Sequence, residues 1–169
     1  MSRALADPPG EWRRISPRLA VVRELSAVIT TVVLLAATSV PLALRLAGVW
    51  PGCPAWLAWA LPSVVLASGA LGCAVIPFQV RATRYALRED DVAISRGVVY
   101  HRSEVIPYGR IQYVDVIAGP LLRAFGLCEL QVHTASPDAH PEIPGLPRDV
   151  GDALRDELAR RGEERLAGL

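Results

Sequence analysis

The sequence predicts a membrane hairpin of two helices followed by an α+β domain, in which a bent antiparallel sheet or partly open barrel is capped by a C-terminal helix. Two long stretches near the N-terminus, residues 25–44 and 56–78, contain no charged side chain. From Arg81 onward, apolar and polar residues alternate with a period of two, which indicates strands buried on one face. After Asp149 the apolar residues recur at helical spacing, which indicates one closing helix.

The composition supports a membrane protein with one modest domain. Of the 169 residues, 51% are hydrophobic, and the mean hydropathy of +0.30 is high for a soluble domain. All 18 basic residues are arginine, and the formal net charge is +1. We interpret the absence of lysine as codon bias in a GC-rich bacterium and not as evidence for phosphate binding. We expect no nucleic-acid partner.

Each apolar stretch is long enough to cross a bilayer. At about 1.5 Å per residue, residues 25–44 reach about 30 Å, which is the thickness of the hydrocarbon core. We expect Pro41 to kink or end the first helix. Three tryptophans bracket the proline-rich connection between the stretches and indicate an aromatic belt: Trp50, Trp56 and Trp59.

The second stretch also has a face of small residues, which allows another helix to approach closely in lipid. This face favours packing within the hairpin, and contact between copies is the alternative. It consists of Ser68, Gly69, Ala70, Gly72, Cys73 and Ala74.

The arginines predict the orientation of the hairpin. Four arginines lie at positions 13–23 and three at positions 81–88, whereas only Arg45 lies between the two stretches. Because positive residues favour the cytoplasmic side, both termini are expected in the cytoplasm of a bacterial cell. We therefore divide the chain into a basic cytoplasmic segment (1–24), a transmembrane hairpin (25–80) and a cytoplasmic domain (81–169). A signal peptide is disfavoured because the first apolar run is too long and a second one follows.

The domain is expected to begin with strands at residues 83–87, 92–95 and 98–102 and a further strand from Glu104. A turn at 107–109 leads into a strand at 111–117, with Ile111 and Tyr113 on one face. Gly119 and Pro120 end this strand, because proline lacks the backbone donor that a sheet needs. Residues 121–125 then form one helical turn, closed by Gly126 in a left-handed conformation.

The last third of the domain is expected to hold a strand, an edge strand and a helix. Residues 128–133 form the strand, residues 135–141 a loop, and residues 142–144 the edge strand, where proline is tolerated. Asp149 is the predicted N-cap of the helix. The apolar stripe of this helix comprises Val150, Ala153, Leu154, Leu158 and Arg161, and the tail from residue 162 is expected to fray.

No residue pattern predicts catalysis, a cofactor or a metal. Cys53, Cys73 and Cys128 fall in three different parts of the predicted architecture, so none of them can pair within the chain. His101, His133 and His140 are expected to be exposed strand and loop residues. The sequence contains no phosphate-binding glycine loop and no nucleophile elbow, so we expect that the protein is not an enzyme.

The segment "YALREDDVAISRGVVYHR", followed by "IPYGRIQYVDV", "GPLLRAFGL", "LQVHTA" and "IPGL", resembles the bacterial PH-like domain of YdbS-like membrane proteins. The resemblance runs from about Tyr85 to the final helix, and the upstream apolar stretches fit the same architecture. It implies a binding or assembly module without an assigned active site. It also suggests, as a partner, a larger relative with tandem copies of the domain.

We therefore predict a membrane-anchored, non-catalytic protein-interaction or assembly module at the cytoplasmic face. Its partners are the lipid bilayer and another membrane protein, with self-association as an alternative. The expected contact residues lie in the central turn: Pro120, Leu121, Leu122, Arg123 and Phe125. The competing interpretation of Arg123 is structural: its stem covers the sheet while its head pairs with Asp115 or a carbonyl.

The alternative function is a sensor of anionic lipid headgroups. Arg81, Arg84 and Arg88 would lie beside the bilayer and attract anionic lipid. However, residues 89–169 contain nine arginines and fourteen acidic residues, which disfavours capture of an anionic surface by the rest of the domain.

Overall fold

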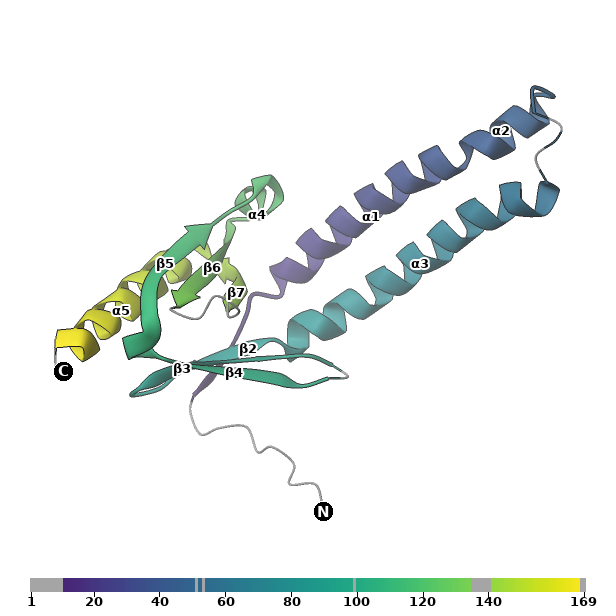
Figure 1. Cartoon of the computed structure of the whole chain (residues 1–169). Helices are drawn as coiled ribbons and strands as arrows, with labels where there is room; N and C mark the ends of the chain where they lie inside the picture. The colour runs from purple at the N-terminus through teal and green to yellow at the C-terminus, as the bar shows by residue number, and fades with distance from the viewer. Residues whose placement is uncertain (1–10, 51, 53, 99, 135–140, 168–169) are drawn as a thin grey trace, which may run out of the picture. The chain divides into compact units, whose positions relative to one another are not determined.

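The computed structural model describes residues 11–50, 52, 54–98, 100–134 and 141–167 of the chain (Figure 1). It divides into two compact units, Ala20–Pro77 and a second unit that combines Met1–Leu19 with Phe78–Leu169. Cys53, His140 and nearly all of the loop predicted at 135–141 lie outside the described residues.

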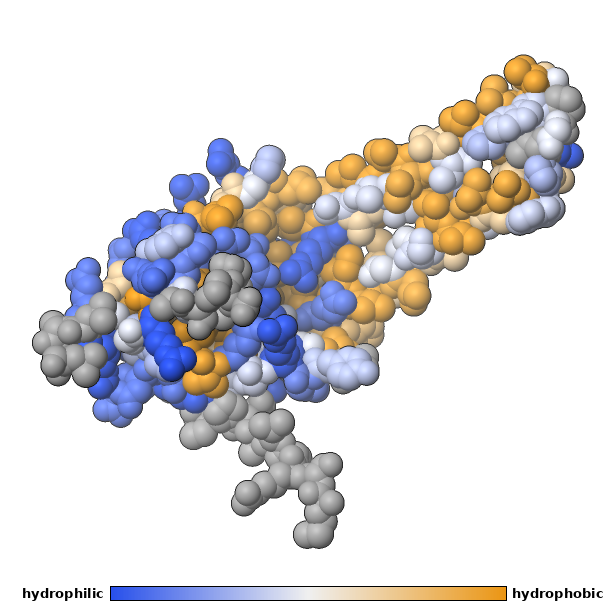
Figure 2. Space-filling view, in the orientation of Figure 1, coloured by the Kyte–Doolittle hydropathy of each residue, from blue (hydrophilic) through white to orange (hydrophobic). Residues whose placement is uncertain are grey.

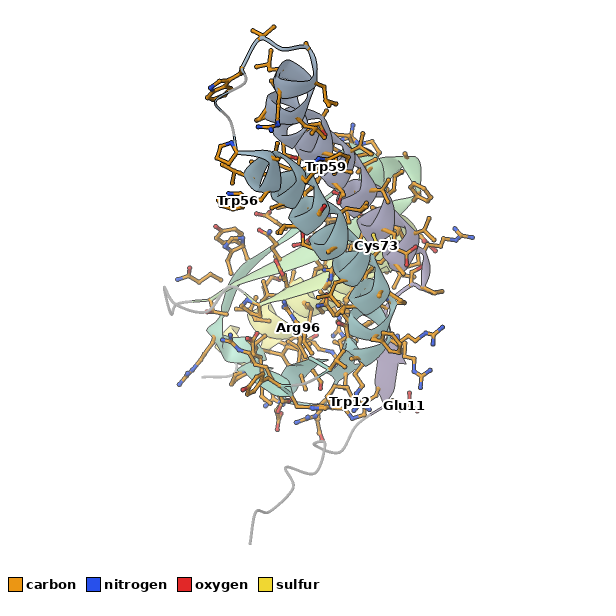
Figure 3. The ribbon with its side chains drawn as sticks, turned by 90° about the vertical axis from the view of Figure 1, so that its right-hand side faces the viewer. Glu11, Trp12, Trp56, Trp59, Cys73 and Arg96 are labelled. Carbon is orange, nitrogen blue, oxygen red and sulfur yellow. The ribbon has the colours of Figure 1, made fainter. Side chains whose placement is uncertain are left out.

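The first unit is a hairpin of apolar helices: α1 (Arg18–Thr38), α2 (Val40–Leu46) and α3 (Ala55–Ala82). Two spans, Arg18–Leu46 and Ala55–Ala82, are long and apolar enough to cross a membrane, and the most apolar window of each is unburied. Figure 2 shows hydrophobic surface along both of them. Trp56 and Trp59 lie toward the end of α3 that meets the connection (Figure 3), where an aromatic belt was predicted.

Proline and glycine shape the hairpin. The helical run breaks at Ser39 because Pro41, in the first turn of α2, has no N–H to bond a carbonyl of the preceding turn. Pro62 and Pro77 lie inside α3. A Cβ added to Gly69 would lie 2.5 Å from Thr31 Oγ1, so this glycine permits close packing of α3 on α1. A Cβ added to Gly72 would have no atom of the described residues within 4 Å.

The domain contains two antiparallel sheets that do not close into a barrel. The first sheet has the order β1-β2-β3-β4 and the second has the order β5-β6-β7. The strands are β1 (Trp12–Arg14), β2 (Arg84–Leu87), β3 (Asp91–Arg96), β4 (Arg102–Pro107), β5 (Ile111–Ile117), β6 (Leu127–Thr134) and β7 (Glu142–Pro147). The short helices are η1 (Tyr108–Arg110) between β4 and β5, and α4 (Pro120–Ala124) between β5 and β6; α5 (Arg148–Ala167) follows β7.

The first sheet differs from the prediction in two places. Strand β1 pairs with β2 across Trp12↔Ala86 and Arg14↔Arg84, so part of the predicted N-terminal segment belongs to this sheet. The strand predicted at 98–102 is wrong. Gly97 adopts φ +113°, which turns the chain, and Arg96 pairs with Arg102, so the residues between them form the hairpin connection.

The second sheet has a β-bulge in β5. The register shifts between Ile111 and Tyr113, and Ile111 is buried whereas the side chain of Tyr113 is 54% exposed. The prediction that they share a face is therefore wrong, because an extra residue resets the alternation. In β6 the predicted alternation is confirmed, since Cys128, Leu130 and Val132 are buried. The edge strand β7 extends to Pro147, three residues beyond the prediction.

Helix α5 covers the second sheet and contacts β5, β6, β7 and η1 (Figure 1). It begins at Arg148, so Asp149 lies in its first turn and not at the N-cap. Its buried face consists of Gly151, Leu154, Leu158 and Gly162, whereas the predicted Ala153 is exposed. The helix continues to Ala167, beyond the predicted end, because Arg161 and Arg165 bond to the β2–β3 region.

The core lies between the two sheets and under α5. Its largest fully buried side chains come from every layer of the domain: Tyr108, Ile94, Leu127, Leu130, Ile143, Leu146, Leu158, Val92, Val132 and Cys128. Tyr108, from the short helix between the sheets, donates a hydrogen bond from its hydroxyl to the carbonyl of Arg88 (2.9 Å). Arg161 of α5 donates to the same carbonyl (2.7 Å), so one buried acceptor ties α5 to the first sheet.

Candidate interaction surface

The central turn is a short helix between two glycines, with half-buried apolar residues and an exposed tip. Helix α4 follows Gly119, and Gly126 closes it with φ +66°, the left-handed conformation that the sequence predicts. Leu121, Leu122 and Phe125 are half-buried, whereas Pro120 and Arg123 are exposed. Of the five predicted contact residues, three therefore help to hold the turn and two are available for contact.

Arg123 is only weakly held within the domain. Its guanidinium donates one long hydrogen bond, of 3.5 Å, to the carbonyl oxygen of Ala118 at the end of β5. Asp115, the other partner considered from sequence, lies 3.6 Å from the His133 imidazole instead. The contact with Ala118 places the Arg123 head beside β5, so α4 and β5 present one continuous surface.

The exposed side of β5 adds an aromatic ring and an isoleucine to this surface. Tyr113 is 54% exposed and stacks on the His133 ring, with centroids 4.2 Å apart and planes 11° apart. Ile117 is 46% exposed and ends β5, three residues before α4 begins. We call Tyr113, Asp115, Ile117, Pro120 and Arg123 the α4–β5 surface.

The three arginines proposed as lipid-proximal have different environments. Arg88 is half-buried and pairs with Asp91 at 3.2 Å, because it closes the β2–β3 turn. The guanidinium of Arg84 lies over the Trp12 ring, 5.3 Å from its centroid. Arg81, in the last turn of α3, is exposed. Arg88 is therefore occupied inside the domain, unlike Arg81.

Strand β1 adds two arginines, which were not predicted to lie near Arg84. It brings Arg13 and Arg14 to the edge of the first sheet beside β2. The run from Trp12 to Arg14 is only three residues long and precedes a predicted helix, so periodicity alone gives no strand signal.

A polar hollow of about 630 Å³ lies between the β2–β3 turn, η1 and the C-terminal half of α5. Each arginine that lines it has an acidic partner: Arg160 with Glu157 and Glu164, Arg161 with Glu157, and Arg165 with Asp90. The Arg165–Asp90 pair joins α5 to the β2–β3 turn, whereas the other pairs lie within α5. Together they leave little unbalanced charge for a ligand.

Within the described residues, no three His, Cys, Asp or Glu side chains gather as metal ligands. Cys73 and Cys128 are free thiols, and burial raises the pKa of Cys128. A Cβ added to Gly151 of α5 would overlap the Cys128 sulfur, so this thiol packs in the core against the helix.

Two apolar helices of membrane-spanning length and a two-sheet domain closed by one helix define a membrane protein with a PH-like domain. The chain belongs to the Bacterial PH domain family, whose sequence profile matches residues 19–162. It is 31% identical over 108 residues to the UPF0699 transmembrane protein YdbS of Bacillus subtilis (strain 168), an alignment that covers 63% of this chain and 67% of that protein. No solved structure matches the chain. The resemblance found from the sequence is confirmed.

Proposed function

We propose that the protein is a membrane-anchored, non-catalytic interaction module, whose PH-like domain binds another membrane protein at the cytoplasmic face through the α4–β5 surface. The observation that carries this proposal is the combination of an exposed ring, isoleucine and arginine on one rigid frame. Aromatic residues and arginine are the types that most often anchor protein interfaces.

The frame is suited to recognition because its exposed groups are already ordered. Tyr113 is held by stacking on His133, and the turn is held by Leu121, Leu122 and Phe125. A partner that binds here therefore loses little side-chain entropy, which otherwise weakens association. Arg123 would pair with an acidic group on the partner, since its single long bond to Ala118 is easily replaced.

The partner suggested by the sequence resemblance is a larger membrane protein with tandem PH-like domains, and a second copy of this chain is the alternative. A tether in the membrane favours both, because it confines the two surfaces to the same thin layer and so raises their effective concentration.

Photocrosslinking in native membranes tests the proposal. The photoreactive amino acid p-benzoylphenylalanine replaces Ile117, and the control places it at Tyr100, an 87% exposed aromatic residue in the β3–β4 connection. We expect a discrete protein adduct from position 117 and none from position 100. Mass spectrometry then tells a second copy from another protein.

The same experiment includes Arg123→Ala, with Arg155→Ala in α5, whose side chain is 43% exposed, as its control. We expect Arg123→Ala to reduce the adduct several-fold and Arg155→Ala to leave it unchanged. Adducts of equal yield from positions 117 and 100, or lipid adducts alone, would show that this surface is not a protein interface.

A further inference from the structure

The connection between β3 and β4 exposes large apolar side chains where a turn is usually polar. Tyr100 is 87% exposed, the highest value of any large hydrophobic side chain in the described part of the chain, and Val98 is 44% exposed. Turns are ordinarily built from glycine, proline, asparagine, aspartate and serine. Gly97 shapes this turn, since it has φ +113° and a Cβ on it would overlap the carbonyl oxygen of Tyr100. The β3–β4 tip, as we call Val98 and Tyr100, is therefore held at the end of the hairpin.

The strand register places this tip at the end of the first sheet to which both spans attach. One residue of each strand lies in a row across this end of the sheet: Arg14, Arg84, Ser95 and Ser103. Strand β1 ends at the row, four residues before α1 begins, and β2 starts at the row, two residues after α3 ends. Strand β3 runs back past the row and β4 returns to it. The tip therefore lies just beyond the row, on the side where the chain enters and leaves the spans.

The chain is too short to hold this end of the sheet far from the membrane. Phe78, the last residue of the second apolar stretch, precedes Ala82 by four helical residues, which span about 6 Å. The step from Ala82 to Arg84 adds at most about 7 Å. The tip lies three residues beyond the row, which corresponds to at most about 10 Å along the strands. It can therefore reach the headgroup layer, which adds about 5–8 Å to each side of the hydrocarbon core.

The charges at the base of the tip are balanced within the domain. Arg96 pairs with Glu142 at 3.1 Å. Arg102, opposite Arg96 in the register, pairs with Glu104 at 2.8 Å. Each of these arginines therefore has a carboxylate of its own. Burial of apolar area, and not attraction to anionic lipid, is what the tip offers to a membrane.

We propose that Val98 and Tyr100 insert into the interfacial layer of the bilayer and so dock the first sheet on the membrane surface. Tyrosine is enriched in this layer because its ring is apolar and its hydroxyl reaches water. Lipid is the occupant that the chain itself brings to the tip, since both spans attach at the same end of the sheet. The tip is separate from the α4–β5 surface and does not depend on the function proposed for that surface. With lipid as the occupant, position 100 gives no protein adduct, in line with its use as the crosslinking control.

The test uses the full chain in liposomes of phosphatidylcholine, which has no net charge, and the fluorescent amino acid Anap. Anap replaces Val98 in one variant and Val105, a valine of similar exposure (48%) within β4, in the other. Two quenchers report its surroundings: phosphatidylcholine with a nitroxide at carbon 5 of the acyl chain, and iodide in the water on both sides of the membrane. We expect the nitroxide lipid to quench position 98 several-fold more than position 105. Iodide should quench position 105 several-fold more than position 98.

Two further variants, with Anap kept at position 98, test Tyr100 itself. Tyr100→Asp places a carboxylate at the tip, whereas Ser103→Asp adds the same charge at an exposed position of β4. We expect Tyr100→Asp to remove most of the nitroxide quenching and to restore iodide quenching, because a carboxylate is costly to take out of water. Ser103→Asp should leave both unchanged. Thermal midpoints in detergent should equal that of the parent protein for both variants, since neither side chain is part of the core.

Three results would overturn the proposal. Iodide quenching at position 98 as strong as at position 105 would show that the tip lies in water. Protection of position 98 from both quenchers would show that protein, and not lipid, covers the tip. Nitroxide quenching that survives Tyr100→Asp, or that Ser103→Asp removes equally, would show that Tyr100 does not anchor the tip in the bilayer.

Discussion

Two glycines flank α4 in different backbone conformations, and this difference yields a matched pair of variants. Gly126 has φ +66°, whereas Gly119 has φ −65°, and a Cβ would meet nothing at either position. We expect Gly126→Ala to destabilise the protein by about 1–2 kcal/mol through backbone strain alone. Gly119→Ala should be neutral or slightly stabilising, because it restricts the unfolded chain.

Thermal unfolding of the full chain in detergent measures both variants. Equal midpoints for the two alanine variants would show that the left-handed turn is not needed. Gly126 lies outside the α4–β5 surface. The crosslink yield from position 117 in the Gly126→Ala variant therefore shows how far destabilising the α4 turn weakens partner binding.

Gly151 sets the distance between α5 and the second sheet. A Cβ at this position would overlap the Sγ of Cys128, which is fully buried in β6. We expect Gly151→Ala to lower the thermal midpoint, although alanine favours helices by about 1 kcal/mol over glycine. Combining it with Cys128→Ala should recover much of the loss, because the sulfur that blocks the new methyl group is removed.

A double-mutant cycle tests this packing contact. The coupling should be favourable, so that the double variant is more stable than the sum of the single changes allows. Additive losses of stability would mean that the Cys128 sulfur is not what prevents a larger residue at position 151. The pair also shows what one sequence can and cannot tell: the alternation of β6 predicts that Cys128 is buried, but not that a glycine of α5 must lie against it.

At the scale of elements, regular patterns were predicted well and long-range pairings were not. The two apolar spans follow from their length and lack of charge, and β6 and the closing helix follow from periodicity. The bulge in β5 and the position of β4 depend on how neighbouring strands pair, which no local window contains. Strand β1 is the clearest case, because it is defined by pairing with residues about 70 positions later.

The functional features also differ in whether a local pattern or a long-range pairing defines them. The turn around Arg123 could be found from its glycines and its isolated charge. The pairing of Arg14 with Arg84 could not, since these residues become neighbours only in the sheet. For the same reason, a fragment that starts at Thr83 would lack β1 and leave β2 as an unpaired edge, so binding experiments need the full chain.

The contact between η1 and α5 predicts a loss of stability at alkaline pH. Burial raises the pKa of Tyr108 above its ordinary value of 10.0, and Arg161 partly offsets this effect. The unfolded chain then releases the tyrosine proton first. The contribution of Tyr108 is therefore complete below about pH 10 and is lost as the pH rises toward the higher pKa of the folded state. Burial also raises the pKa values of Tyr85 and Cys128.

Tyr108→Phe tests this account. It removes two hydrogen bonds of the Tyr108 hydroxyl, one donated to the Arg88 carbonyl and one accepted from Arg161. Arg161 still bonds the Arg88 carbonyl, so we expect a loss of about 1–2 kcal/mol at pH 7. Above pH 10 the variant should lose stability less steeply than the parent protein, with Tyr85 and Cys128 accounting for the remaining slope. Identical slopes in melts between pH 7 and pH 11 would contradict the role of Tyr108.

At the scale of the whole molecule, strand pairing restricts the topology. The first sheet joins β1, which precedes the hairpin, to β2, which follows it. A sheet cannot be paired through a bilayer, so both ends of the hairpin must lie on the same side of the membrane, whichever side that is. The β1–β2 pairing, which does not depend on charge, therefore predicts that the chain crosses the membrane an even number of times.

The arginine distribution predicts that this side is the cytoplasm. We expect alkaline phosphatase, which is active only outside the cytoplasm, to be silent when fused after Leu169 and active when inserted at Gly52. Green fluorescent protein, which folds in the cytoplasm, should give the reverse pattern at the same two positions. Phosphatase activity at Leu169 alone would show that both ends of the hairpin lie outside the cytoplasm. That result is still compatible with the pairing of β1 and β2. Activity at both positions, or at neither, would mean that the hairpin does not cross the membrane twice.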